Sequence, residues 1–308
     1  MYTATAEFGA LQETGNRLTW IAKFRSCRAR GVTGIDGLVS VGPVNLDLDG
    51  KRAIVTGGSK GIGYAVARGL ANEGVDVVIA ARTAEPLESA ARALSEETGR
   101  RVIAIPTDTG DDDQVRALVE RTVAELGGVD ILVNSAATPW SAGASRDLAG
   151  TDDDTVRREI EIKVLGYLRT ARAVAPHLVR QRWGRIINIS GLGARQANSI
   201  AQTIRNISVS ALTKNLADEL GPAGVNVTVV HPGLTRTERL TDRLTAEAGK
   251  SGRTIADLEA ELARNTLRRI IDVTEVADVV TFLASPRSIA ITGDAIAAGG
   301  GVPGPVYY

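Results

Sequence analysis

The chain has 308 residues and a mass of 32.3 kDa, which suits one large α/β domain or two small domains. Its 36 basic and 36 acidic side chains cancel, so we expect no nucleic acid and no membrane among its partners. Hydrophobic residues make up 44% of the chain, enough for a full core, and the single cysteine, Cys27, excludes an intrachain disulfide. The apolar runs are too short for a membrane span, and we predict a cytoplasmic protein without a secretory signal or a metal site.

Residues 1–46 differ in character from the rest of the chain. Residues 11–30 form a weakly amphipathic basic stretch, and residues 31–43 are rich in glycine without a clear period. We interpret this segment as a flexible N-terminal extension. A helix that binds a partner or a membrane, and a misassigned translation start, remain open alternatives.

From Leu46 onward, short runs rich in Val and Ile alternate with segments of helical character. Such apolar runs are typical of strands buried on both faces. The alternation predicts one α/β domain over residues 47–308, with a Rossmann-type doubly wound parallel sheet of about seven strands. The predicted strands are 51–56, 75–80, 101–105, 129–134, 185–190, 225–230 and 289–296, and the predicted helices are 62–73, 86–98, 112–126, 152–182, 208–220 and 275–285.

A charged, helix-favouring insertion interrupts this rhythm at residues 235–271. It holds few aromatic side chains and lies late in the domain, after the sixth predicted strand. We predict a helical lid over a substrate pocket.

A glycine-rich segment, TGGSKGIG, directly follows the first predicted strand and opens the first predicted helix. Its glycines permit a sharp turn at Gly57, the approach of a diphosphate at Gly61 and close helix packing at Gly63. The helix start would offer free N–H groups and a positive dipole end to phosphates. This context predicts a dinucleotide-binding loop rather than a turn without a ligand, and its predicted cofactor-binding residues are Thr56, Gly57, Ser59, Lys60, Gly61, Ile62 and Gly63.

The second predicted strand indicates which dinucleotide the loop prefers. NAD enzymes of this fold usually carry an acidic residue near the end of that strand, whereas here Arg82 follows it and no carboxylate is present. Arg82 and Lys60 together suit a 2′-phosphate, because a guanidinium can grip a phosphate by two hydrogen bonds. We therefore predict NADP, with NAD less favoured; two solvated surface charges are the alternative interpretation.

Further polar residues lie where predicted strands end. Asp108 follows the third strand, and Asn134 ends the fourth. Pro232 and Gly233 end the sixth strand, and Thr237 comes shortly after. Open α/β sheets bind ligands at the carboxyl ends of their strands, so we predict cofactor contacts at these positions.

Taken together, the motifs resemble the short-chain dehydrogenase/reductase family from about residue 46 to residue 301. Its TGxxxGxG is similar to residues 56–63, its adenine-contacting Asp looks like Asp108, and its NNAG is matched imperfectly by residues 134–137. Its Pro-Gly with a later Thr, which contacts the nicotinamide amide, looks like Pro232, Gly233 and Thr237. The resemblance implies hydride transfer between NAD(P) and a carbonyl or alcohol, and a homodimer or homotetramer built on the two long helices.

The resemblance fails at the residues that handle the proton. The family uses a Tyr, a Lys four residues later, a Ser on the fifth strand and an Asn on the long helix before it. The neighbouring sequence places Gln202 at the Tyr position, Asn206 at the Lys position, Gly191 at the Ser position and Lys163 at the Asn position. Gln and Asn do not exchange protons near neutral pH, so the usual Tyr mechanism is not expected.

Other side chains near these positions could replace the family's proton-handling residues. Lys163 is the one titratable residue among them and can act as an acid if its pKa falls, unless it reaches solvent or pairs with Glu159. Arg205 can polarise a carbonyl or bind an acidic substrate, unless it forms a surface ion pair. Asn206 can hold the nicotinamide ribose by hydrogen bonds. Ser190 is expected to point away from the site unless the strand ends early, since neighbouring strand residues face opposite sides.

Two further side chains near the site, Tyr167 and His231, are interpreted as packing and structural residues respectively. The favoured function is an NADP-dependent oxidoreductase that acts on a small-molecule carbonyl or alcohol with atypical proton transfer. A cofactor-binding protein without catalysis, and a non-redox enzyme such as a dehydratase, isomerase or cyclase, are the alternatives.

Overall fold

The computed structural model describes residues 45–137, 147–197 and 199–303; apart from its last two residues, the expected N-terminal extension lies outside them. Seven parallel strands form one sheet in the order β3-β2-β1-β4-β5-β6-β9. Their bounds are β1 Arg52–Thr56, β2 Asp76–Ala81, β3 Val102–Pro106, β4 Ile131–Asn134, β5 Gly184–Ile189, β6 Val225–Pro232 and β9 Ala295–Ala298. The order reverses between β1 and β4, which confirms the predicted doubly wound sheet.

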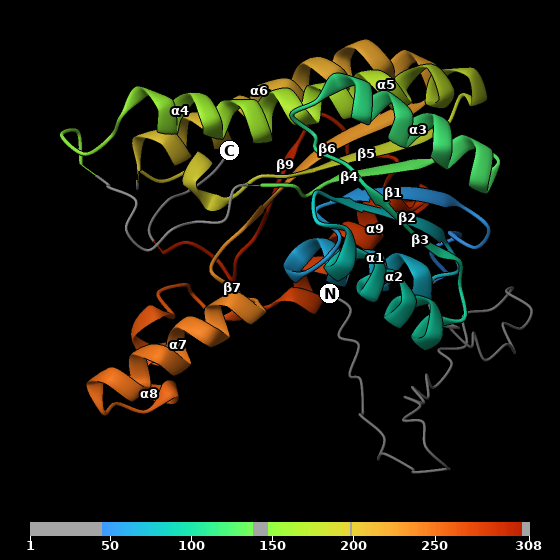
Figure 1. Cartoon of the computed structure of the whole chain (residues 1–308). Coiled ribbons are helices and arrows are strands. Elements are labelled where there is room, and N and C mark those ends of the chain that lie inside the picture. Colours follow the sequence, from blue (N-terminus) through green and yellow to red (C-terminus); the bar gives the residue numbers. More distant parts are fainter. Residues whose placement is uncertain (1–44, 138–146, 198, 304–308) are drawn as a thin grey trace, which may run out of the picture. The chain divides into compact units, whose positions relative to one another are not determined.

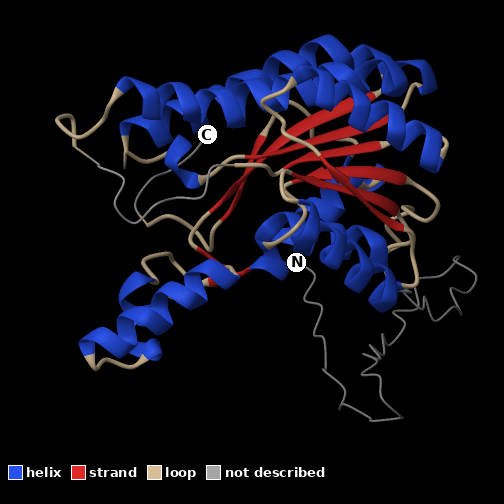
Figure 2. Cartoon of the chain, in the orientation of Figure 1, coloured by secondary structure: helices blue, strands red, loops and turns tan. Residues whose placement is uncertain are grey.

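Helices cover both faces of this sheet (Figures 1 and 2). One layer consists of α1 Gly61–Asn72, α2 Ala84–Thr98 and α9 Val273–Ala284, and the other of α3 Asp112–Leu126, α5 Gly166–Gln181 and α6 Ile200–Leu220. Strand side chains alternate between the layers: Ala53 and Val55 pack on the first side, whereas Ile54 packs on the second. Burial on both faces explains why the strand sequences are almost continuously apolar.

Among the described residues, no helix combines the length and the apolar character needed to cross a membrane.

The last strand lies farther along the chain than the sequence predicts. Residues 289–296 were expected to form it, but β9 begins at Ala295. The side chain of Asn226 donates to the backbone carbonyls of Ile289 and Ile291, and Gly293 turns the chain with a φ of 72°. These contacts use the backbone groups that a strand would need, so the apolar spacing was misleading here.

The insertion at residues 235–271 is helical, as predicted. It consists of β7 Thr235–Arg236, α7 Glu238–Ser251, α8 Ile255–Leu262 and β8 Ile271–Asp272. The two short strands pair in parallel and close the base of the helical hairpin. Arg236 strengthens this base through ion pairs with Glu259 and Asp272. The hairpin has a small apolar core of its own, formed by Leu240, Leu244, Leu258 and Ile270.

The long helix predicted over residues 152–182 is divided by a π-helical turn. α4 spans Asp153–Glu159, the turn spans Ile160–Leu165, and α5 continues from Gly166. A π turn admits an extra residue into the helix and so rotates the side chains around it. Lys163 lies within this turn and is buried.

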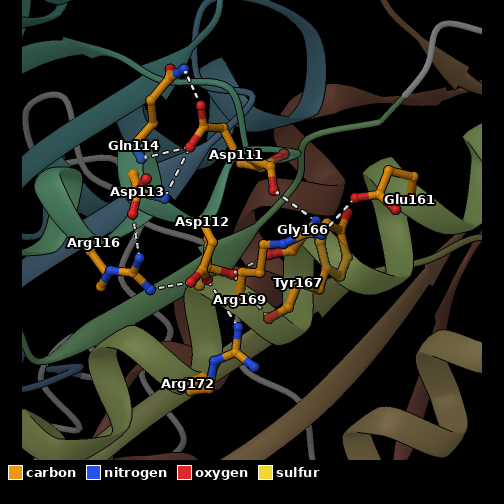
Figure 3. Close-up of polar contacts among 12 residues, drawn as sticks. Asp111, Asp112, Asp113, Gln114, Arg116, Glu161, Gly166, Tyr167, Arg169 and Arg172 are labelled. Atoms are coloured by element: carbon orange, nitrogen blue, oxygen red, sulfur yellow. Dashed lines mark hydrogen bonds and ion pairs between the residues drawn. The ribbon is translucent and has the colours of Figure 1, made fainter.

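Polar contacts hold the start of α5 against the start of α3 (Figure 3). Arg169 pairs with Glu161 at 2.6 Å, across the end of the π turn, and Arg172 donates to Asp112 at 2.9 Å. The side chain of Asp111 caps α3 by accepting two backbone N–H groups of its first turn. These contacts fix the α5 side of the turn that carries Lys163.

His231, near the end of β6, ties the stability of the fold to pH. Its side chain is only 1% exposed, and burial, together with the charges of Arg195 and Lys163, lowers its pKa from 6.5 to about 4. Below pH 6.5 the unfolded chain takes up this proton first, so the free energy of unfolding falls, by about 3 kcal/mol at pH 4. We predict that His231→Asn removes this part of the acid sensitivity, measured by urea unfolding between pH 4 and 7.

The matched control is His177→Asn, at the other histidine of the chain. This variant should keep the full acid sensitivity of the wild type. Equal losses of stability in all three proteins would contradict the prediction.

Candidate active site

The glycine loop between β1 and α1 has the geometry that a diphosphate site needs. Gly57 and Gly61 have φ angles of 69° and 60°, which favour glycine. A Cβ on Gly57 would lie 2.9 Å from the Ala136 nitrogen, and one on Gly63 would overlap the Gly57 carbonyl. Gly57 and Gly63 therefore have no room for a side chain. The residues present fit a dinucleotide whose phosphates meet the start of α1.

The other predicted members of this loop have different roles. Thr56 is fully buried, and its hydroxyl oxygen accepts the N–H groups of Ser135 and Ala136 at 3.1 and 3.2 Å. Thr56 thus joins the end of β1 to the segment after β4. Ile62 packs against the core beneath α1. The remaining predicted cofactor residues on this side, Ser59, Lys60 and Arg82, are at least partly exposed at the carboxyl ends of β1 and β2.

Asp108 lies where the sequence predicts, just after β3. Its carboxylate accepts the Gly110 N–H at 2.9 Å, and its own N–H donates to the Gln114 side chain at 2.9 Å. The residue is half-buried, and its role as an adenine contact stays a prediction.

Asn134, predicted as a cofactor contact, lies at the end of β4 within a network of buried side chains. Its fully buried side chain donates to Asn188 at 3.0 Å and accepts the Thr170 hydroxyl at 2.7 Å. Asn188 in turn donates to the Thr213 hydroxyl at 2.9 Å. The amide of Asn134 therefore belongs to a buried polar chain that joins β4 and β5 to α5 and α6.

The end of β6 brings its predicted residues near the loop. Pro232 is buried, and Gly233 packs so closely on Gly299 that a Cβ would lie 2.9 Å from its Cα. Thr237 caps α7, and its methyl group would lie 3.5 Å from a Cβ on Gly61. Pro232, Gly233 and Thr237 thus lie at the same sheet edge as the glycine loop.

Lys163 is buried beside Asn206. Its side chain is 4% exposed, and its Nζ donates to the Ser190 carbonyl at 2.9 Å and to Asn206 Oδ1 at 3.3 Å. Lys163 therefore does not reach solvent, and it does not pair with Glu159, which forms an ion pair with Arg205 instead. Burial lowers the pKa of Lys163 well below its usual value, with a further lowering by Arg205 and an opposing effect of Glu159.

Ser190 does not point away from the site, the case left open for a strand that ends early. β5 ends at Ile189, so the alternation of the strand no longer applies to the next residue. The Ser190 hydroxyl lies 3.1 Å from the Asn206 carbonyl and 3.3 Å from Asn206 Oδ1. Lys163, Ser190 and Asn206 therefore form one cluster, which we call the lysine cluster.

Arg205, predicted as a catalytic residue, is engaged in an ion pair. Its guanidinium forms a buried ion pair with Glu159, which anchors α6 to the end of α4. Tyr167 has the predicted packing role: it is 1% exposed and donates its hydroxyl to the Ile189 carbonyl at 3.0 Å. Gln202, at the expected Tyr position, is half-buried on the first turn of α6.

The sequence interpretation missed Glu238. Its carboxylate accepts the N–H of Gly61 at 3.1 Å, although the two residues are 177 positions apart. The only sequence signal was its place next to Thr237, and no spacing rule links that position to the glycine loop.

A pocket opens where the insertion meets the end of β6. Its lining includes backbone of Gly233 and Gly299 from the sheet edge and polar side chains from the insertion and the turn after β5. The polar lining residues are Gln196, Arg264, Asn265 and Arg269.

Comparisons with known proteins agree with this fold and loop. The family model described as enoyl-(acyl carrier protein) reductase matches residues 57–303. The peroxisomal 2,4-dienoyl-CoA reductase of Danio rerio is 33% identical over 252 residues, which cover 81% of this chain and 80% of the relative. The 3-oxoacyl-(acyl-carrier-protein) reductase FabG of Vibrio cholerae is 33% identical over 264 residues, which cover 83% of this chain and 99% of the relative.

A solved structure extends the likeness to three dimensions. L-sorbose reductase from Gluconobacter frateurii, complexed with NADPH and L-sorbose, matches with a TM-score of 0.80 and 28% sequence identity. The match covers 85% of this chain and 100% of that chain. The chain therefore belongs to the short-chain dehydrogenase/reductase family of oxidoreductases.

Proposed function

We propose that this protein is an NADP-dependent oxidoreductase that interconverts a carbonyl and an alcohol, with Lys163 in place of the usual proton-handling residues. The observation that carries the proposal is the contact between Lys163 and Asn206. By resemblance, Asn206 stands where the family has Lys, and Lys163 stands where it has Asn. The two residue types are exchanged between facing helices, and the cation still lies at their junction.

The lysine cluster leaves a donor for a ligand. An ammonium group has three N–H donors, and the described contacts of Lys163 use two of them, on Ser190 and Asn206. The remaining donor can hold a ribose hydroxyl or supply a proton to a developing alkoxide. NADPH, when bound, would provide the hydride, and a lowered pKa makes the buried ammonium a stronger acid for the proton.

NADP is the cofactor best supported by the loop. Arg82 and Lys60 lie exposed at the ends of β2 and β1, and β2 ends without a carboxylate. The structurally similar L-sorbose reductase was solved with NADPH. The pocket beside Gly233, with its amide and guanidinium groups, supports a polar carbonyl substrate.

We also propose a homodimer or homotetramer built on the long helices. α6 presents Ile200, Ile204 and Ile207, which are 38%, 40% and 50% exposed. Their spacing of four and three residues places them on one helix face. An apolar stripe of this kind supports association of α6 with a second copy.

The test of the function is consumption of NADPH with a panel of aldehydes, ketones, ketoses and 3-oxoacyl thioesters, followed by absorbance. We predict that Lys163→Met lowers kcat/KM by at least about 100-fold, the low end of the contribution of general acids. Because the acid works in its protonated form and its pKa is lowered, wild-type activity should fall as pH rises, well below pH 10.5. The variant should lose this limb of the pH profile.

The matched control is Lys214→Met, on an exposed lysine of α6 that pairs with Asp218. The double variant Lys163→Asn/Asn206→Lys, which returns each residue type to the opposite helix, should recover activity relative to Lys163→Asn. Unchanged activity in Lys163→Met, or no NADPH consumption with any substrate, would contradict the proposal. Product formation without NADPH consumption would instead indicate a non-redox enzyme.

A separate prediction concerns the choice of cofactor. Arg82→Asp should weaken NADPH binding about 10- to 100-fold, the value of a charged hydrogen-bonded contact, and leave NADH binding unchanged or improved. Fluorescence titration with both nucleotides measures the ratio. Arg92→Asp, an equal charge change on an exposed residue of α2, is the control. An NADPH to NADH preference that does not change in Arg82→Asp would be evidence against a 2′-phosphate contact.

A further inference from the structure

The carboxylate of Glu238 lies at the start of α1, on the glycine loop. Its Oε2 accepts the Gly61 N–H at 3.1 Å. Glu238 is the first residue of α7, so this contact joins the helical insertion to the proposed cofactor loop. An anion of the chain itself thus takes one of the N–H groups with which a helix start binds phosphate.

Helix α1 has no anion of its own at this end. Its N-cap residue, Lys60, makes no side-chain cap, and its first turn holds no acidic residue. By contrast, Asp111 caps α3, and Asp272 and Glu275 form a capping box on α9. The positive end of the α1 dipole is left for an anion from elsewhere, and Glu238 provides it.

The start of α7 also lies close over the loop. A Cβ on Gly61 would lie 3.5 Å from the methyl group of Thr237 and 4.0 Å from Glu238 Oε2. A diphosphate bound to the same helix start needs this N–H group and the space beside it. It would also bring its own negative charge next to the carboxylate, so the two anions exclude each other.

We propose that Glu238 is a tethered competitor of the cofactor: its carboxylate occupies part of the diphosphate site and must leave before NADP binds. The inference rests on the proposed function. Glu238 is exposed, so its side chain can turn into solvent. Arg236, two residues before Glu238, forms ion pairs with Glu259 and Asp272, which fix the strand that leads into α7. The contact between Glu238 and Gly61 therefore weakens cofactor binding, and bound cofactor weakens that contact by the same factor.

Titration of NADPH into the wild type, Glu238→Gln and Glu247→Gln tests the proposal. Glu247→Gln removes the same charge from an exposed position farther along α7. We expect Glu238→Gln to bind NADPH about three- to tenfold tighter than the wild type, the size of a charge effect at an exposed helix start, and Glu247→Gln to stay within about twofold. The gain should shrink as salt is raised, because exposed charges are screened.

Displacement of NADPH by inorganic pyrophosphate tests the diphosphate site separately from the rest of the cofactor site. It should displace NADPH from Glu238→Gln at lower concentrations than from Glu247→Gln. If the wild type binds NADPH clearly and Glu238→Gln binds it equally or more weakly, the proposed role of Glu238 is overturned and the proposed function stays intact. Failure of all three proteins to bind NADPH would overturn the proposed function and the competitor with it.

Discussion

Parallel hydrogen bonding between strands that are buried on both faces is the constraint on which the rest of this structure depends. Successive parallel strands must be joined by a crossover connection, and here a helix on one face of the sheet provides it. Parallel pairing also places the carboxyl ends of all seven strands at one edge. The glycine loop after β1, Asp108 after β3 and Gly233 after β6 meet there for this reason. Residues nearly two hundred positions apart thus share one site without any direct sequence relation.

The lysine cluster shows how a charge is kept at this edge. A lone ammonium in the interior is costly, but carbonyl oxygens of Ser190 and Asn206 accept two of the three N–H groups of Lys163. The π turn directs Lys163 toward β5, and the early end of β5 turns Ser190 toward the same point. The buried Arg205–Glu159 pair balances a second charge, and both of its members act on the pKa of Lys163. The arrangement is a tertiary one, since its members come from the residue after β5, from α6 and from the π turn.

Two features that the sequence pattern did not reveal share a cause. Residues 289–296 have the apolar character of a strand, yet the amide of Asn226 binds the carbonyls that would have paired. Asn134 lies at a strand end as expected, yet its amide is used by Asn188 and Thr170. In each case a polar side chain from another element competes for the same hydrogen-bonding groups. Sequence periodicity carries no information on such competition.

The sequence by itself determined the fold class, the glycine loop, the basic residues after β1 and β2, and the helical insertion. These follow from local composition and from glycine positions, which a single segment contains in full. Only the tertiary structure decided that Lys163 contacts Asn206 and not Glu159, that Ser190 faces inward, and that Glu238 reaches Gly61. Each of these depends on where a strand ends or how a helix turns relative to a distant neighbour. The register between elements, and not the pattern within them, determines those contacts.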